Sequence, residues 1–376
     1  MASRNPSSPL PASLTPRQKR ILQLLWPERA LSRRDVQREL GVHPNLIGED
    51  IGVLLEQRLV REGDTTANGR GRPGIPLRID DVSRHVIGIA ISPDGVELSK
   101  VNLLGHPIGT TQTIQADDAK TLIPRTAAML RKQISPDTLA VGVSATGVVD
   151  PVTHTLVLSS SIPQATGTSL APLYTAAGDT PVLVQNDMHA LAARWLLSDR
   201  AASDQDVLLI LLEDGRLGSA MLIGGVPNQG CTIGANEIGH SRFPVDTPLC
   251  YCGQKGCLER IFSSQQLVKL QPKSPGRSLG DELLHGHKPS KAGEEIEHQL
   301  WAGIANAANF VRPHRVVMVG SFSQDDAFFS RFTSGVQSLL LRGLSDRTRI
   351  ERWTLPAMTW GEVASWVALV DLLDAR

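Results

Sequence analysis

Several features are scarce in this chain of 376 residues, and each scarcity excludes a class of protein. No apolar run reaches the roughly 18 residues that a membrane-spanning helix needs, so no membrane partner is expected. The first residues are polar, rich in Pro and Ser, and lack the apolar stretch of a secretory signal. We therefore expect a cytoplasmic protein whose four cysteines form no disulfides.

The chain also has no net charge at pH 7, because 38 Lys and Arg balance 38 Asp and Glu. The balance is uneven along the chain, since residues 1–80 contain 13 basic against 9 acidic side chains. A basic N-terminal region favours a polyanionic partner, although four charges decide nothing by themselves. The length predicts two or three domains.

Residues 14–60 show the pattern of three short helices. Thr15 before Pro16 and Ser32 before the second apolar stripe are typical N-caps, and Gly41 is typical of a helix end. A short turn joins the second segment to the third, which predicts a helix-turn-helix whose third helix enters the major groove. The apolar stripe of that third helix is predicted to comprise Leu46, Ile47, Ile51, Leu54 and Leu55.

The next residues predict a wing, with strands over 59–62 and 75–79 around a Gly-rich tip. Arginines on such a tip suit a narrow minor groove, while the alternative is a plain linker. Against DNA binding, Glu49 and Asp50 on the third helix would oppose the phosphate backbone. The predicted DNA contacts are Arg33, Arg34, His43, Asn45, Arg70 and Arg72.

From residue 84 onward, strand pairs alternate with helices, which predicts an α/β architecture of two lobes in tandem. A ligand is expected in the cleft of such a pair. We predict a disordered lead over 1–13, a winged helix-turn-helix over 14–80, a first lobe over 84–195 completed by a helix at 360–376, and a second lobe over 196–358.

Three of the four cysteines crowd into one short segment behind a histidine. His240, Cys250, Cys252 and Cys257 give the spacing H-x9-C-x-C-x4-C, and thiolate with imidazole is the ligand set of tetrahedral Zn²⁺. Four protein ligands predict a closed, structural zinc site, and the alternative is a group of buried free thiols. Cys231 lies outside the spacing and is expected to be a small core residue.

The same segment resembles a known signature. The run "EIGH" followed by "CYCGQKGCLE" is similar to the signature of the ROK family, which contains sugar kinases such as glucokinase and sugar-responsive repressors. "VGVSATGVVDPVTHTL" and "VLVQNDMHALAA" resemble further parts of that family, so the likeness covers about 84–376. The winged helix-turn-helix resembles the head of the repressor branch.

The resemblance implies a two-lobed domain that is actin-like, of the ribonuclease H-like ATPase type, with a sugar in the interlobe cleft. It also implies that His240 binds zinc through one ring nitrogen and faces the sugar with the other. For the Asn-Asp pair, a helix N-cap is an alternative role that is compatible with sugar binding. The implied sugar contacts are Asn186, Asp187, Glu237, His240 and Glu259.

The chain departs from the family's kinases where phosphates bind. Asp187 keeps the position of the kinase base, but Ala90 stands where the first phosphate loop has its Asp. Glu213 and Asp214 replace uncharged positions of the second loop, where a carboxylate would repel a phosphate. We therefore expect no enzyme activity and regard Asp187 as vestigial, with a sugar kinase of divergent ATP loops as the alternative.

Together these features predict a DNA-binding transcriptional regulator, a repressor of carbohydrate-metabolism genes that responds to a sugar or sugar derivative. Its partners would be a double-stranded DNA operator, a sugar effector and further copies of itself, as a homodimer or homotetramer. The expected location is the cytoplasm, at the nucleoid. A third possibility is a zinc-dependent oligomeric binding protein whose head no longer reads DNA.

Overall fold

The fold was analysed in a computed structural model of the chain. Its description covers residues 14–63, 75–92, 94–115, 119–150, 152–159, 165–198, 204–230, 234–272, 276–286, 288–343, 345–355 and 358–373. The predicted lead over 1–13, the wing tip with Arg70 and Arg72, and Cys231 lie outside these ranges.

The N-terminal head contains the three expected helices, α1 (Pro16–Leu25), α2 (Arg33–Leu40) and α3 (Pro44–Glu56). Thr15 and Ser32 cap the first two through side-chain oxygens that accept from the third residue's backbone N–H. Gly41 ends α2 at φ 64°, a left-handed conformation that glycine adopts without strain. These local signals therefore act as predicted.

The burial of α3 corrects one detail of the predicted apolar stripe. Ile47, Ile51 and Leu54 are fully buried, as the pattern predicts. Leu46 is instead 39% exposed, because it precedes Ile47 by one residue and so lies about 100° away around the helix. Leu46 therefore belongs to the outer face of α3.

A small sheet supports the head, with strands β1 (Leu31–Ser32), β2 (Val60–Glu62) and β3 (Pro76–Ile79). The central strand β3 pairs antiparallel with both neighbours. The two predicted strands of the wing are thus present.

The chain forms two compact units, one running to Ala190 and including Thr359 onward, the other spanning Leu191–Met358. The first unit holds a five-stranded sheet in the order β11-β7-β4-β5-β6. Strands β4, β7 and β11 are mutually parallel. Strand β5 pairs antiparallel with β4, and β6 pairs antiparallel with β5. The strands are β4 (His85–Ser92), β5 (Gly95–Asn102), β6 (Gln112–Ile114), β7 (Thr138–Ala145) and β11 (Val182–Asn186).

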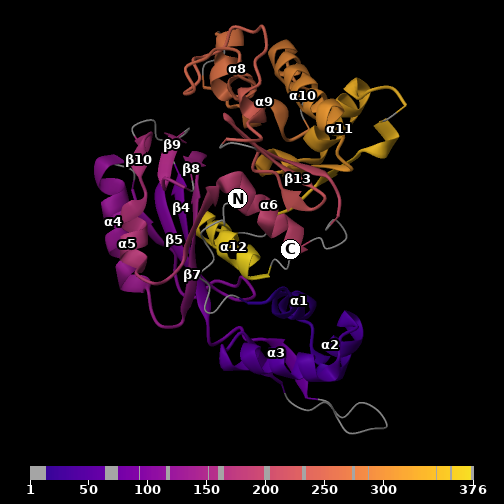
Figure 1. The fold of residues 1–376 in the computed structure, drawn as a ribbon. Coiled ribbons are helices and arrows are strands. Elements are labelled where there is room, and N and C mark those ends of the chain that lie inside the picture. The colour runs from indigo at the N-terminus through magenta and orange to yellow at the C-terminus, as the bar shows by residue number, and fades with distance from the viewer. Residues whose placement is uncertain are drawn as a thin grey trace, which may run out of the picture. The chain divides into compact units, whose positions relative to one another are not determined.

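Helices cover both faces of this sheet (Figure 1). Helices α4 (Ala119–Gln133) and α5 (Ala171–Ala177) pack on one face, and α12 (Trp360–Leu373) packs on the other. Gly88 and Gly142 let α12 approach closely, because a Cβ on either would lie within 2.4 Å of an α12 carbonyl oxygen. Strands β8 (Gly147–Asp150), β9 (Thr155–Ser159) and β10 (Thr168–Ser169) form a separate small sheet.

The second unit has its own five-stranded sheet in the order β14-β13-β12-β15-β16. Its core contains four packed phenylalanines together with the long helix α10 (Lys291–Val311). The strands are β12 (Val207–Glu213), β13 (Arg216–Ile223), β14 (Val226–Pro227), β15 (Arg315–Val319) and β16 (Arg349–Arg352). Helix α6 (Asp187–Ser198) begins in the first unit and ends in the second. The other helices of the second unit are η3 (Ile238–His240), α7 (Leu258–Ile261), α8 (Ser264–Leu270), α9 (Leu279–Leu283), η4 (Ser321–Gln324), α11 (Asp326–Leu339) and η5 (Ser345–Arg347). The expected α/β class is confirmed.

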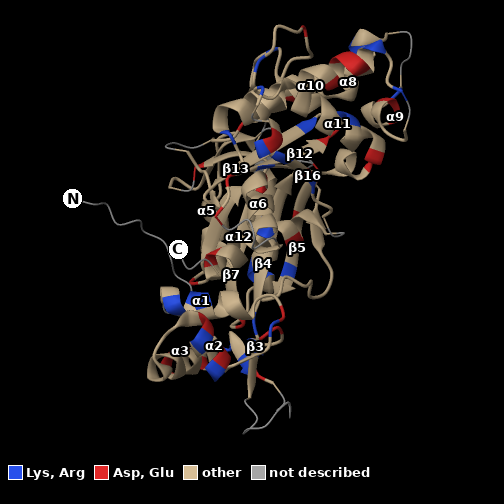
Figure 2. Cartoon of the chain, turned by 90° about the vertical axis from the view of Figure 1, so that its right-hand side faces the viewer, with Lys and Arg blue, Asp and Glu red and all other residues tan. Residues whose placement is uncertain are grey.

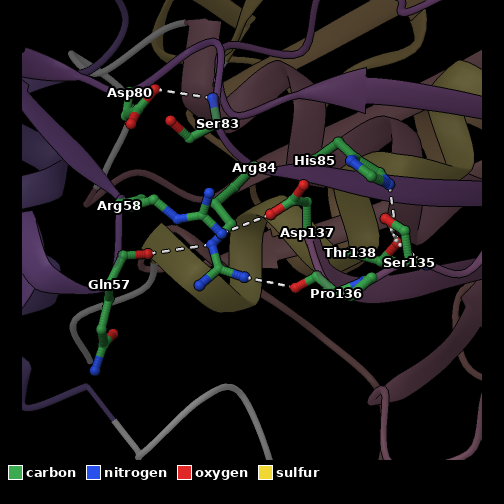
Figure 3. Close-up of polar contacts among 10 residues, drawn as sticks. All are labelled: Gln57, Arg58, Asp80, Ser83, Arg84, His85, Ser135, Pro136, Asp137 and Thr138. Atoms are coloured by element: carbon green, nitrogen blue, oxygen red, sulfur yellow. Dashed lines mark hydrogen bonds and ion pairs between the residues drawn. The ribbon is translucent and has the colours of Figure 1, made fainter.

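The head packs onto the first lobe within one compact unit. Arg58, just after α3, forms an ion pair of 2.6 Å with Asp137 (Figure 3). Arg84 donates to the carbonyl of Gln57 at 3.2 Å and to that of Pro136 at 2.8 Å, so it joins the two parts as well.

A second contact ties α1, whose basic residues are blue in Figure 2, to the C-terminal helix. Lys19 Nζ donates to the carbonyl of Asp371 at 2.6 Å. Trp26 meets Trp366 edge to face at 5.7 Å between ring centroids. The C-terminal helix therefore touches both the head and the sheet of the first lobe. None of the helices in the described ranges has the length and apolarity to cross a membrane.

Candidate functional site

The four predicted metal ligands converge in the second unit. The ligand atoms of His240, Cys250, Cys252 and Cys257 all lie within 4.8 Å of one another. Cys252 Sγ is 3.5 Å from Cys257 Sγ, and Cys250 Sγ is 3.6 Å from His240 Nδ1. Bonds of about 2.3 Å to a tetrahedral ion would set ligands about 3.8 Å apart, so the cluster has the dimensions of a metal site.

Local backbone geometry explains why the cysteines meet. The backbone N–H of Cys250 donates to Gln254 O at 2.9 Å and closes a tight turn. Gly253 and Gly256 in this turn both have φ 83°, and a Cβ on Gly256 would lie 2.3 Å from Phe243 O. Conformation therefore favours glycine at both positions, and at Gly256 the lack of space requires it as well.

Burial and mutual proximity shape the acid–base chemistry of the cluster. Burial raises the pKa of the Cys250 thiol, and burial together with Cys252 raises the pKa of Cys257 to about 12. Burial and the neighbouring Arg260 lower the pKa of His240, which favours the neutral imidazole. A bound divalent cation would offset the cost of ionising the thiols. With four protein ligands, such a site leaves no open position.

Two further predicted sugar contacts lie beside the cluster in the same unit. Glu237 Oε2 is 3.9 Å from His240 Nε2. Glu259, on α7, is 8% exposed, and its Oε2 has no hydrogen-bond partner among the residues that the structure describes. Burial raises the pKa of Glu259, while Arg260 and a hydrogen bond from Tyr251 act in the opposite direction. A buried acceptor without a donor is a place where a ligand hydroxyl can bind.

Sequence reasoning missed Tyr251, although it lies between two of the predicted ligands. Its hydroxyl is 2.7 Å from His240 Nε2, and the two rings meet edge to face at 4.9 Å. The nitrogen that was expected to face a sugar is therefore in contact with a tyrosine. Its position inside the Cys-x-Cys motif was the available signal.

The predicted Asn-Asp pair lies in the first unit, where β11 ends and α6 begins. Asn186 Nδ2 donates to Gly147 O at 2.7 Å, and its Oδ1 accepts from the N–H of Met188 at 2.7 Å. Asp187 is 8% exposed and also accepts from Met188 N–H, at 2.8 Å. The helix-capping role considered for this pair is thus observed.

The acidic residues of the second loop contact backbone N–H groups of their own chain. Glu213 accepts from Ser321 N–H at 2.7 Å and also from the Ser321 hydroxyl. Asp214 accepts from Ser264 N–H at 2.7 Å and from the Ser264 hydroxyl. The carboxylates thus occupy amide donors that a phosphate would need.

The predicted DNA contacts within the described ranges lie around the starts of α2 and α3. Arg33 forms an ion pair of 2.8 Å with Glu62, whereas Arg34 is exposed. His43 caps α3 by accepting from Asn45 N–H at 3.4 Å, and both side chains are exposed. Asn45 and Arg34 are therefore available to a partner.

The expectation that Asp50 opposes DNA is wrong. Asp50 is 4% exposed, accepts from Gln18 Nε2 at 3.1 Å and pairs with Arg17 Nε. It follows Ile47 by three residues, which places it on the buried stripe of α3. Of the two acidic residues near the start of this helix, Glu49 is the one that remains exposed.

Comparison with known proteins places these features in a family. The sequence model of the ROK family matches residues 98–354. The chain is 24% identical to the DNA-binding transcriptional repressor Mlc of Escherichia coli over 278 residues, which is 71% of this chain and 66% of that protein. It is 20% identical to a xylose repressor of Caldicellulosiruptor bescii, over 79% of this chain and 81% of that protein.

Kinases are also among the relatives. An N-acetyl-D-glucosamine kinase of Citrobacter koseri is 27% identical over 57% of this chain and 74% of its own length. The crystal structure of a ROK family transcriptional regulator, a homologue of the E. coli MLC protein, matches with a TM-score of 0.75 at 20% identity, over 95% of this chain and 96% of that one. The crystal structure of a ROK family glucokinase from Streptomyces griseus, in complex with glucose and AMPPNP, matches with a TM-score of 0.58 at 22% identity. The match covers 77% of this chain and 98% of that one.

Proposed function

This chain belongs to the ROK family, and we propose that it is a DNA-binding transcriptional repressor of carbohydrate-metabolism genes, controlled by a sugar or sugar derivative. One observation carries the proposal. The fold of a ROK regulator matches 95% of this chain, a share that includes most of the head, whereas the fold of a ROK glucokinase matches 77%. A transcriptional regulator requires a DNA-binding part such as this N-terminal head.

The acidic second loop supports a regulator over a kinase. Phosphoryl transfer depends on positioning a triphosphate with backbone amides and cations. Glu213 and Asp214 already accept from Ser321 and Ser264, and their charge would repel a phosphate. The chain is therefore proposed to lack ATP-dependent activity.

The head supports DNA as the partner. With Asp50 buried against Arg17 and Gln18, the outer face of α3 loses one of its two predicted acidic residues. Asn45 can pair with a base edge and Arg34 with phosphate, which suits a helix entering the major groove. A homodimer or homotetramer would present two heads to the two half-sites of a palindromic operator at the nucleoid.

The predicted sugar contacts remain Asn186 and Asp187 in the first unit, and Glu237, His240 and Glu259 in the second. Carboxylates and a carboxamide suit hydroxyls, which donate and accept at once. We assign Zn²⁺ to the His/Cys cluster, where it would hold the turn that follows η3. Because the head and first lobe form one compact unit, any ligand that favours one arrangement of the lobe also biases the head.

The first experiment is retention of sheared genomic DNA from the source organism on the zinc-loaded protein, followed by sequencing. We expect a few short palindromes to be enriched, and the doubly substituted Arg34→Ala, Asn45→Ala protein to lose that enrichment. Neighbouring genes then name the sugars to test as effectors. Retention of no discrete site at low salt, or hexose-dependent ATP hydrolysis by the wild type, would overturn the proposal in favour of a binding protein or a kinase.

A further inference from the structure

The second unit has a groove of about 690 Å³ between the C-terminal half of α10 and strand β13. Helix α10 contributes one stripe to its wall, at the helical spacing i, i+3, i+4 and i+7. These residues are Gly303, Asn306, Ala307 and Phe310. Strand β13 contributes alternate residues, which are Ser219, Met221 and Ile223. Of the predicted sugar contacts, Glu237 also lines the groove.

The floor of the groove is buried, but its rim carries apolar side chains in solvent. Met221, on the floor, is 4% exposed. On the rim, Phe310 is 89% exposed and Ile223 is 55% exposed. Val226, which pairs with Ile223 across the hairpin of β13 and β14, is 48% exposed. Grouped apolar side chains of this kind mark an interaction site, whereas scattered single ones do not.

The chemistry of the wall favours an apolar occupant. Much of its polar surface is already hydrogen-bonded within the chain, since Asn236 Nδ2 donates to Asn228 O at 2.6 Å and the Ser219 hydroxyl donates to Asn236 O. Charged side chains of both signs line it, Asp206 and Arg242 among them. A sugar is bound by polar groups with free hydrogen-bonding capacity, and nucleic acid is bound by a basic surface. An apolar protein side chain suits this groove better than either.

The patch offers both halves of a contact, a projecting ring and an apolar groove beside it. A twofold axis brings each half against the other, because both copies then use the same surface. The ring of Phe310 offers about 150–200 Å². Two rings, two rims and two groove walls together approach the roughly 1,000 Å² that a specific interface needs. A small apolar molecule in the groove would instead leave Phe310 in water.

We propose that this groove and Phe310 form an interface between two copies of this chain. Phe310 of each copy enters the groove of the other and is the central anchor of the contact. The inference deepens the proposed function and rests on it in one respect, because a repressor that reads a palindrome needs two heads. The exposed apolar surface that carries it does not depend on that function.

The first test is Phe310→Asp, with the mass of the zinc-loaded protein in solution measured by light scattering and analytical ultracentrifugation. F310D should have half the mass of the wild type, with the dissociation constant of the dimer raised about a hundredfold. Because Phe310 is 89% exposed, the substitution removes little packing within its own chain. Val152→Asp is the matched control, since Val152 is 85% exposed but lies in the first unit, and it should keep the wild-type mass. A monomeric wild type, or equal masses of F310D and the wild type, would overturn the interface.

Photochemical cross-linking of the full chain identifies what covers the groove. With p-benzoylphenylalanine in place of Phe310, irradiation should give a covalent dimer. Mass spectrometry should locate the link within residues 206–243 or 303–311 of the second copy. Links confined to the same chain, or to a small molecule that purifies with it, would overturn the proposed occupant.

Retention of genomic DNA separates failure of the interface from failure of the proposed function. We expect F310D to lose the enrichment of palindromes and V152D to keep it, because two joined heads bind two half-sites together. Palindromes enriched by a monomeric wild type would overturn the interface and leave the repressor standing. A dimer that F310D divides, with no DNA site enriched by the wild type, would support the interface and contradict the repressor.

Discussion

Two acidic places in the second unit differ in how their carboxylates are satisfied. Glu213 and Asp214, at the predicted phosphate side, accept from backbone and hydroxyl donors of their own chain. Glu259, at the predicted sugar side, keeps a buried oxygen without a donor in the part of the chain that the structure describes. A buried polar atom without a partner costs free energy, so an external donor has most to gain there. We call the surroundings of Glu213 and Asp214 the closed place, because internal anions already occupy the donors there. We call the surroundings of Glu259 the open place, because a ligand can still bind there.

The largest expected effect tests whether the open place depends on the metal cluster. Cys257→Ser removes a buried ligand, so bound zinc should fall from about one ion per chain to nearly none. The melting temperature should drop by roughly 10 °C, because zinc binding contributes to folding of the turn. Metal analysis and calorimetry measure both. The same substitution at Cys231 is the control, and unchanged zinc content in C257S would contradict the assigned cluster.

The next prediction extends the comparison to the head, where Asp50 is a satisfied buried carboxylate. Asp50→Ala leaves Arg17 and Gln18 without their acceptor, so stability in urea should fall by about 2 kcal/mol. Glu49→Ala, one residue away and exposed, should leave stability unchanged and strengthen retention on DNA. Equal stability of the two variants would place Asp50 on the surface.

Glu213→Ala tests the closed place directly. It removes the acceptor of Ser321 N–H and hydroxyl, which should cost about 1–2 kcal/mol in chemical unfolding. ATP binding should not appear, since Asp214 still carries its charge beside the loop. Glu295→Ala, at an exposed position of α10, is the control and should change nothing. Tight ATP binding by E213A would show a working nucleotide site behind one carboxylate.

Glu259→Gln tests the open place and should act on ligand affinity without lowering stability. The amide keeps the shape but offers a weaker acceptor, so affinity for a bound sugar should fall about tenfold, measured by calorimetry. Stability should stay equal or rise by about 1 kcal/mol, because a neutral group is cheaper to bury. Loss of stability would show that Glu259 is satisfied within the chain, as Glu213 is.

The smallest effect concerns the contact of the head with the first lobe. Arg58→Ala removes an ion pair whose two side chains are about half exposed, so stability should change by about 0.5 kcal/mol or less. Limited proteolysis at the end of α3 should nevertheless become faster, because the pair joins the head to the lobe. Arg38→Ala removes an ion pair within α2 and should not change that rate. Equal rates would mean that Arg84 and the α1 contacts hold the head alone.

Much of the fold could be predicted because its signals are short. Thr15, Ser32 and Gly41 act within one helical turn, and their geometry agrees with the pattern. The spacing of His240 and three cysteines predicted a cluster because two glycines of left-handed conformation close the turn locally. A period or a spacing of a few residues carries its own structural meaning.

Contacts over long sequence distances could not be predicted in this way. Asp50 was taken as a surface acid because its partners, Arg17 and Gln18, lie more than 30 positions earlier. The partner of Glu213 is Ser321, more than 100 positions later. Nothing in the local pattern of either acid distinguishes a repelling charge from a satisfied one.

The sequence by itself determined the helix caps, the α/β alternation and the ligand set of the cluster, because these follow from conformational preference and ligand chemistry. Only the tertiary structure decided how individual polar atoms are used. Tyr251 occupies the free nitrogen of His240, Asp50 is buried, and Glu213 accepts from an amide of another loop. Hydrogen bonds are short and directional, so their partners are known only once distant segments are packed together.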